Sequence, residues 1–344
     1  MAPATRSSSG VLERVPEDET TPERMPDETK KADATSVGAR ARQDCCADGL
    51  RFLIVVAISF CMASLGYSFV GELSRGRLAA VSRSQDSWAE IATLAAWRIF
   101  ELGLSWFSGL DALDVAMLDL LAHGPLFYLQ ATFYSLGATT AASALLVDVL
   151  AAATPFYLMR PLSAVHRPAS RGSSFADVID LPLQLYTSAL AASIYTIIVA
   201  LSLRLVLPRI LVVYFPGLPS LEPAYAASYA DVLPATGLFG AAASALIYAP
   251  SATTPRDAAD RKHFDPVTAT LGETVRWNLW GYSSRTKIAV CRTAAAMLLV
   301  GVNTYLSCTR TMYGVETPGA VAYAAVWVVA ALCSGLALGL VGGA

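Results

Sequence analysis

Long apolar stretches without charge dominate the pattern of this 344-residue chain. No Asp, Glu, Lys or Arg occurs over residues 52–71, 181–203, 232–255 or 318–344. A bilayer core of about 30 Å is crossed by about 20 apolar helical residues. Because these stretches lack the alternation of barrel strands, helices must satisfy their backbone groups in lipid. The sequence therefore predicts an all-α, polytopic membrane protein.

A domain of six or seven transmembrane helices is expected over residues 49–344. The predicted spans are about 50–72, 137–158, 181–205, 232–249, 288–307 and 319–341. The open case is 88–110, where Glu90, Arg98 and Glu101 share a face with Ser105 and Ser108. That segment either crosses the membrane with its polar stripe turned inward, or lies flat at the interface.

The segment from Asp111 to Leu121 predicts a short interfacial helix that ends at Gly124-Pro125. It contains no Lys or Arg, which favours the non-cytosolic side. The aromatic residues that follow over 127–134 suit the headgroup region.

Residues 1–48 are polar and poor in aromatic and β-branched aliphatic side chains, so we expect a disordered N-terminal tail. Cys45 and Cys46 lie just before the first span, beside several arginines. They are candidate palmitoylation sites if the tail is cytosolic, and otherwise two inert thiols.

The loops that begin at Arg160 and Pro250 are rich in basic residues, which places them in the cytosol. If 88–110 crosses, seven helices leave the N-terminal tail outside and the C-terminus inside. If it lies flat, six helices leave both ends in the cytosol.

Composition supports the same class, since 55% of residues are hydrophobic and 15% are charged, against about 25% charged in soluble chains. The net charge of −2 argues against a nucleic-acid partner. Expected partners are membrane lipids and other membrane proteins.

The sequence contains no His-Glu-x-x-His pair, Gly-x-Ser-x-Gly elbow or phosphate-binding glycine loop, and its three histidines fall in predicted loops. We therefore predict no catalytic, cofactor-binding or metal-binding residue.

Four residues form a candidate intramembrane polar cluster: Arg98, Glu101, Asp148 and Asn303. An Asp at the middle of a span costs about 2.5–3.5 kcal/mol, so Asp148 requires a partner. We hypothesise an Arg98–Asp148 ion pair, which serves either an ion or proton path or only helix packing. Glu90 and Glu101 suit a cation relay or a solvated face, and Asn303 a pathway or a bond to a neighbouring helix. Arg292 is expected to reach the cytosolic headgroups.

Small residues recur at a spacing of four, which lets helices approach closely. The pairs are Gly237 with Ala241, Gly240 with Ser244, Gly335 with Gly339, and Gly339 with Gly343. Packing within one bundle and dimerisation use the same spacing, and we favour packing within the bundle.

Two motifs carry a resemblance: 148–161, which holds Asp148, Pro155 and Arg160-Pro161, and 278–293, which begins Asn-Leu-Trp-Gly-Tyr. On these motifs residues 50–342 resemble a group of uncharacterised multi-pass membrane proteins of filamentous fungi. The resemblance implies a fungal membrane setting and carries no activity.

The leading functional hypothesis is a non-enzymatic integral membrane protein, a scaffold or accessory subunit of an endomembrane or the plasma membrane. The alternative is a small secondary transporter or channel that uses Arg98, Glu101 and Asp148. A third hypothesis, an intramembrane enzyme, has no motif to support it.

Overall fold

The computed structural model describes the backbone of residues 27–163, 166, 174–248, 270–272, 274–275 and 284–343. The chain divides into two compact units, Met1–Leu50 and Arg51–Ala344. Over the described residues the elements are helices, and the one isolated bridge joins Ser82 to Met312. The predicted all-α class is confirmed.

Seven helices in the described part of the chain are long and apolar enough to cross a membrane. They are α1 (Asp27–Leu73, apolar over Asp48–Leu73), α4 (Ala112–Phe133), α5 (Ala138–Met159), α6 (Ser174–Leu205), α9 (Tyr229–Ile247), α12 (Ser284–Thr311) and α13 (Thr317–Gly343). A further helix of 20 residues, α3 (Trp88–Phe107), and the short helices α2 (Arg77–Val81), α7 (Leu207–Tyr214) and α8 (Glu222–Ala226) connect them. Each of the six predicted spans other than 88–110 coincides with the apolar stretch of one long helix to within a few residues.

Helix α4 corrects one prediction, because the expected short interfacial helix is the first half of a buried span. The helix continues through Gly124-Pro125 to Phe133, and 67% of its apolar window is buried. Gly124 leaves room for the ring of Phe239, since an added Cβ would lie 2.0 Å from a ring carbon. The Pro125 carbonyl accepts a hydrogen bond of 2.7 Å from Tyr323. Neighbouring helices therefore stabilise the proline inside the helix, as they do in other membrane spans.

The expected headgroup aromatics are also core residues. Phe127 is 5% exposed and Phe133 is 2% exposed. The pattern of aspartates followed by aromatics was wrong as a sign of an interface, because Arg98 and Arg292 pair with aspartates of α4. Phe127 packs with buried residues of α1 and α5.

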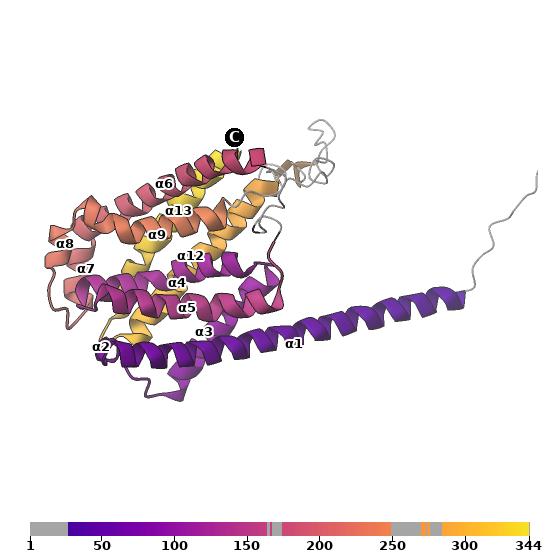
Figure 1. Cartoon of the computed structure of the whole chain (residues 1–344), viewed down its shortest axis with the longest axis horizontal. Coiled ribbons are helices and arrows are strands. Elements are labelled where there is room, and N and C mark those ends of the chain that lie inside the picture. Colours follow the sequence, from indigo (N-terminus) through magenta and orange to yellow (C-terminus); the bar gives the residue numbers. More distant parts are fainter. Residues whose placement is uncertain are drawn as a thin grey trace, which may run out of the picture. The chain divides into compact units, whose positions relative to one another are not determined.

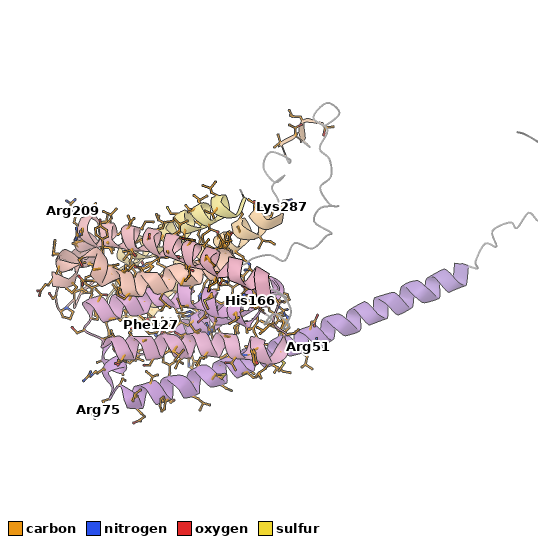
Figure 2. The ribbon with its side chains drawn as sticks, turned by 45° about the horizontal axis from the view of Figure 1, so that its top comes forward. Arg51, Arg75, Phe127, His166, Arg209 and Lys287 are labelled. Atoms are coloured by element: carbon orange, nitrogen blue, oxygen red, sulfur yellow. The ribbon has the colours of Figure 1, made fainter. Side chains whose placement is uncertain are left out.

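The long helices of Arg51–Ala344 run between two ends of the bundle, shown in Figure 2. Arg51, His166 and Lys287 mark one end, which we call the His166 end, and Arg75 and Arg209 mark the Arg75 end. Helices α5 and α9 end at the His166 end, and α6 and α12 begin there.

Helix α3 also runs from end to end. Next to its start, the side chain of Gln85 donates to the carbonyl of Arg310 at the Arg75 end. At its other end, Arg160 donates to the carbonyls of Trp106 and Leu110. Segment 88–110 is therefore not an isolated helix at an interface. Because α3 and α4 both traverse the bundle, Arg51 in the first apolar span and the C-terminal end of α13 lie at the same end of the bundle. The predicted seven-helix arrangement would place them at opposite ends.

Three antiparallel pairs form the bundle, α4 with α5, α6 with α9, and α12 with α13, and α4 also contacts α9 and α12. In Figure 1, α4, α5, α6 and α9 run side by side. Gly240 brings α9 against the backbone of α6, since its added Cβ would lie 2.2 Å from the backbone nitrogen of Ala192. Gly335 likewise meets Thr293 of α12. At Gly240 and Gly335 the small residues serve packing within the bundle, whereas an added Cβ at Gly237 or Gly339 meets nothing within 4 Å.

The predicted disordered tail falls largely outside the described residues. Residues 1–26 are not described, and the backbone from Asp27 is helical. The side chains of Cys45 and Cys46 also lie outside the described part, so their palmitoylation stays a prediction.

Candidate functional site

A group of six polar side chains from four helices meets inside the bundle. The members, which we call the central cluster, are Tyr67 of α1, Arg98 and Glu101 of α3, Asp119 and His123 of α4, and Asp148 of α5. His123 and Asp148 lie halfway along their helices. The cluster is therefore remote from both ends of the spans.

Arg98 is the hub of this cluster. Its Nη1 lies 2.6 Å from Asp119 Oδ1 and 3.3 Å from Glu101 Oε2. Its Nη2 donates to the backbone carbonyl of Asp148 over 3.2 Å. One guanidinium thus joins three helices, because its fork of donors reaches two carboxylates and a carbonyl at once.

The Asp148 carboxylate has a different partner from the one predicted. The hydroxyl of Tyr67 lies 2.9 Å from Asp148 Oδ1 and 2.8 Å from Oδ2 and donates to this carboxylate. Gly66 permits the approach of α1, since its added Cβ would lie 2.5 Å from Val147. The predicted direct Arg98–Asp148 ion pair is wrong, because the packing of α4 brings Asp119 to the guanidinium.

His123 lies between the other two carboxylates. Its Nδ1 is 3.2 Å from the backbone carbonyl of Asp119 and 3.5 Å from Asp119 Oδ1. Its Nε2 is 4.0 Å from Glu101 Oε2. We assign the Nδ1–H tautomer, since Nδ1 faces only acceptors, and this leaves the Nε2 lone pair toward Glu101.

The charges of the cluster do not balance. Three carboxylates face one guanidinium and one imidazole, and Glu101, Asp119 and Asp148 are 5%, 7% and 8% exposed. Among the described residues, Glu101 Oε1 and Asp119 Oδ2 are buried without a hydrogen-bond partner. A small cavity borders the two carboxylates, with Arg98 and Ser105 beside them. An uncompensated buried charge is costly, so a proton or a bound cation would stabilise the excess carboxylates.

Glu101, Asp119 and His123 also have the ligand types of a metal site. Their ligand atoms lie within 4.8 Å of one another. Carboxylate oxygen and imidazole nitrogen suit zinc and other divalent transition ions. The Arg98 guanidinium, however, already contacts both carboxylates, so a metal on the same oxygens would face a cation at short range.

A second polar cluster lies at the His166 end. Asp111 caps the N-terminus of α4, and its Oδ1 accepts the backbone N–H groups of Leu113 and Asp114. Its Oδ2 lies 2.6 Å from His166 Nδ1 and accepts the backbone N–H of Ser163 over 3.0 Å. Burial alone would raise the pKa of Asp111, but the hydrogen bonds from Asp114, His166 and Ser163 lower it to about 2.

Arg292 completes this second cluster. Its guanidinium forms a two-pronged bond with Asp114, with distances of 3.0 and 2.9 Å, and also donates to the carbonyl of Leu246. The prediction that Arg292 reaches the headgroups is wrong, because its guanidinium forms an ion pair with the buried Asp114 near the start of α4. Asp111, Asp114 and His166 also lie within metal-ligand range. Every carboxylate oxygen here has a partner within the protein, so the cluster fastens the start of α4 to its neighbours.

The structure brings three of the four predicted site residues together, Arg98, Glu101 and Asp148. Asn303 lies beside them and joins α12 to its neighbours, since it accepts from Trp97 over 3.2 Å and donates to the Ala122 carbonyl over 3.0 Å. Glu90 lies apart, paired with Arg83 at 2.8 Å.

The sequence analysis missed three members of the cluster, Tyr67, Asp119 and His123. The spacing of four between Asp119 and His123 was a usable signal. It was lost once the helix was ended at Gly124-Pro125 and His123 was placed in a loop.

Comparison with protein-family models, curated proteins and solved structures finds no match. The resemblance to fungal membrane proteins therefore stays a prediction, and the functional argument rests on the geometry of the central cluster.

Proposed function

We propose that this protein is an ion-coupled membrane transporter and that the central cluster binds the coupling cation. The observation that carries the proposal is the excess of buried carboxylates over cations. Glu101, Asp119 and Asp148 face a single guanidinium, and two of their oxygens have no described partner.

A purely structural ion pair does not require more carboxylates than cations. Two opposite charges suffice to fasten two helices, and each further carboxylate in the interior adds desolvation cost. Ionisable groups in membrane spans commonly mark substrate or ion paths for that reason. The cluster also has the property that a coupling site needs, because its charge depends on whether a cation is present.

The placement of the cluster supports coupling as well as binding. Its members come from α1, α3, α4 and α5, so binding a cation changes the contacts among four helices. From α3, the single side chain of Arg98 reaches both α4 and α5. A change in its partners would alter how these helices pack, which is the link between ion binding and movement of a transported solute.

The scaffold or accessory function is the second candidate, and α1 favours it. Its apolar span is 17% buried. Leu53, Leu65 and Phe69 are each more than half exposed. This face suits lipid or the helix of another membrane protein, whereas the central cluster has no role in such a function.

The proposal is tested by electrical recording from proteoliposomes on a solid-supported membrane. Jumps of pH, of Na⁺ and of Zn²⁺ are applied separately to the purified protein. We expect one of these cations to displace charge in the wild type, and Glu101→Gln and Asp119→Asn to remove the signal.

Glu222→Gln is the matched control, because Glu222 is exposed on α8 at the Arg75 end. It should leave the signal unchanged. Traces from the wild type that match empty liposomes for all three cations would overturn the transport proposal and leave the accessory function. Solute jumps from a panel of sugars, amino acids and inorganic anions then identify the transported class.

A further inference from the structure

We propose that the coupling cation is a proton, held between Nε2 of His123 and the carboxylate of Glu101. The role of this proton in driving transport rests on the proposed function. The proton site itself is argued from the geometry of α3 and α4 alone.

The first step is the orientation of the imidazole. Nδ1 faces the backbone carbonyl of Asp119 at 3.2 Å, which fixes the single proton of the neutral ring on that nitrogen. Nε2 then presents a lone pair to Glu101 Oε2 at 4.0 Å. A proton on Nε2 turns this contact between two acceptors into an ion pair at 4.0 Å, and a shift of about 1 Å by either side chain would shorten it to a charge-assisted hydrogen bond.

The second step concerns the other cations that could bind. A divalent ion lies about 2.0–2.2 Å from its oxygen ligands. At Asp119 Oδ1 and Glu101 Oε2 that space is already shared with Arg98 Nη1, at 2.6 and 3.3 Å. The unpartnered oxygens Glu101 Oε1 and Asp119 Oδ2 belong to the same two carboxylates, so an ion bound there would still face the guanidinium at short range. A proton resides on the ligand atom itself and needs no such space, so it can enter without displacing the guanidinium.

The third step is the full electrostatic environment of His123. Asp119 of its own helix, Glu101 of α3 and Asp148 of α5 favour the charged imidazole, and Arg98 opposes it. Tyr67 of α1 donates to Asp148, and α12 contributes the uncharged Asn303 nearby. With three carboxylates and one guanidinium, the first proton on His123 reduces the net charge of the cluster from −2 to −1, and a second on a carboxylate would neutralise it.

The proton also changes which helices hold each other. Without it, Glu101 shares the Arg98 guanidinium with Asp119. With it, Glu101 has a partner on α4, and Arg98 is free to pair with Asp119 and the Asp148 carbonyl alone. Proton binding thus tightens α3 against α4, and proton release returns Glu101 to Arg98.

Histidine-selective ¹³C labelling tests the inference directly, because the chain contains only 3 histidines. The protein is purified in detergent micelles, and its imidazole signals are followed from about pH 5 to 9. The signal of His123 is assigned by its loss in His123→Gln, and by retention in the double variant His166→Gln with His263→Gln.

We expect the His123 signal to titrate within this range. Glu101→Gln should weaken its proton affinity at least about tenfold, since the negative charge 4.0 Å from Nε2 is removed. Glu222→Gln should change it less than about twofold, because exposed and distant charges are screened. A His123 signal that does not titrate, or that is unaffected by Glu101→Gln, overturns the inference.

The two proposals fail in different ways. If His123 titrates as expected but a pH jump displaces no charge in proteoliposomes, the transport function fails and the proton site stands. If a Zn²⁺ jump at constant pH displaces charge and His123 does not titrate, the function stands and the proton assignment fails.

Discussion

Replacing Arg98 by Gln should be among the most damaging single changes in this protein. The substitution removes the hub that contacts Asp119 at 2.6 Å, Glu101 at 3.3 Å and the carbonyl of Asp148 at 3.2 Å. It leaves buried carboxylates without their cation, and breaking a buried pair in this way costs about 3–5 kcal/mol.

Asp119→Asn should destabilise the protein less than Arg98→Gln, although it alters the shortest contact of Arg98, the one with Asp119 Oδ1. Arg98 keeps Glu101 and the Asp148 carbonyl, and the number of buried carboxylates falls. We expect a loss of about 1–3 kcal/mol, the cost of a hydrogen bond to a charged group. In the double variant the effects should not add, with an interaction energy of at least about 1 kcal/mol between the two sites.

The measurement is unfolding by SDS in mixed micelles, followed by circular dichroism. Arg209→Gln on α7 is the control, since this arginine is exposed at the Arg75 end, and it should cost less than about 0.5 kcal/mol. The loss in Arg98→Gln should also shrink at acidic pH, where protons can replace the missing cation. A loss below about 1 kcal/mol for Arg98→Gln, or additive single effects, would refute the reasoning.

Four further outcomes are expected. Gly240→Ala should cost about 1–3 kcal/mol in the same unfolding assay because its Cβ meets the α6 backbone at 2.2 Å, and Gly237→Ala, which meets nothing within 4 Å, should be neutral or stabilising. Tyr67→Phe should cost about 1.5–3 kcal/mol because Asp148 loses its hydroxyl donor, and a wild-type melting temperature in this variant would contradict the contact. The pKa of Asp111, about 2 when folded and about 3.9 when unfolded, makes its carboxylate stabilising above about pH 4; this stability falls away toward pH 2, and Asp111→Asn should flatten stability over that window. Tags at the two termini should be protected from protease together in sealed vesicles, and opposite protection would contradict the paired passage of α3 and α4.

The helices could be predicted where the signal is local. The span that became α6 was predicted at 181–205 because length and lack of charge alone decide whether a segment can cross a bilayer. Helix α4 was missed because it violates the local rule, with Asp114 and Asp119 in its first half and Pro125 in its middle. These groups are tolerated because Arg292, Arg98 and Tyr323 satisfy them from other helices.

The candidate site could be predicted only for residues whose own position in the sequence carries the signal. Arg98, Glu101 and Asp148 were recognised because a charge in an apolar segment must face protein. The choice between Asp119 and Asp148 as the partner of Arg98 depends on how α3 lies against α4 and α5, and no periodicity within one helix encodes that. Once α4 was ended early, its pair of polar residues could not be placed in the bundle at all.

The missing span and the missing site residues have a common physical cause. A helix with several acids is insoluble in lipid alone, so it reaches the bundle interior only together with the helix that carries the complementary charge. Here the loop of residues 108–111 joins α3 and α4 directly, and Arg98 of one meets Asp119 of the other. Helices α3 and α4 therefore form one hairpin, which adds two passages through the bundle and leaves unchanged the end at which every later loop lies. The basic loops after α5 and α9 therefore still share one side of the bundle, as the positive-inside rule expects. The same hairpin places an acid-rich site between α3 and α4, whose contact depends on ion pairs between them. Adding one proton changes these ion pairs, and it would therefore alter the packing of α3 and α4 more than the packing of two apolar helices.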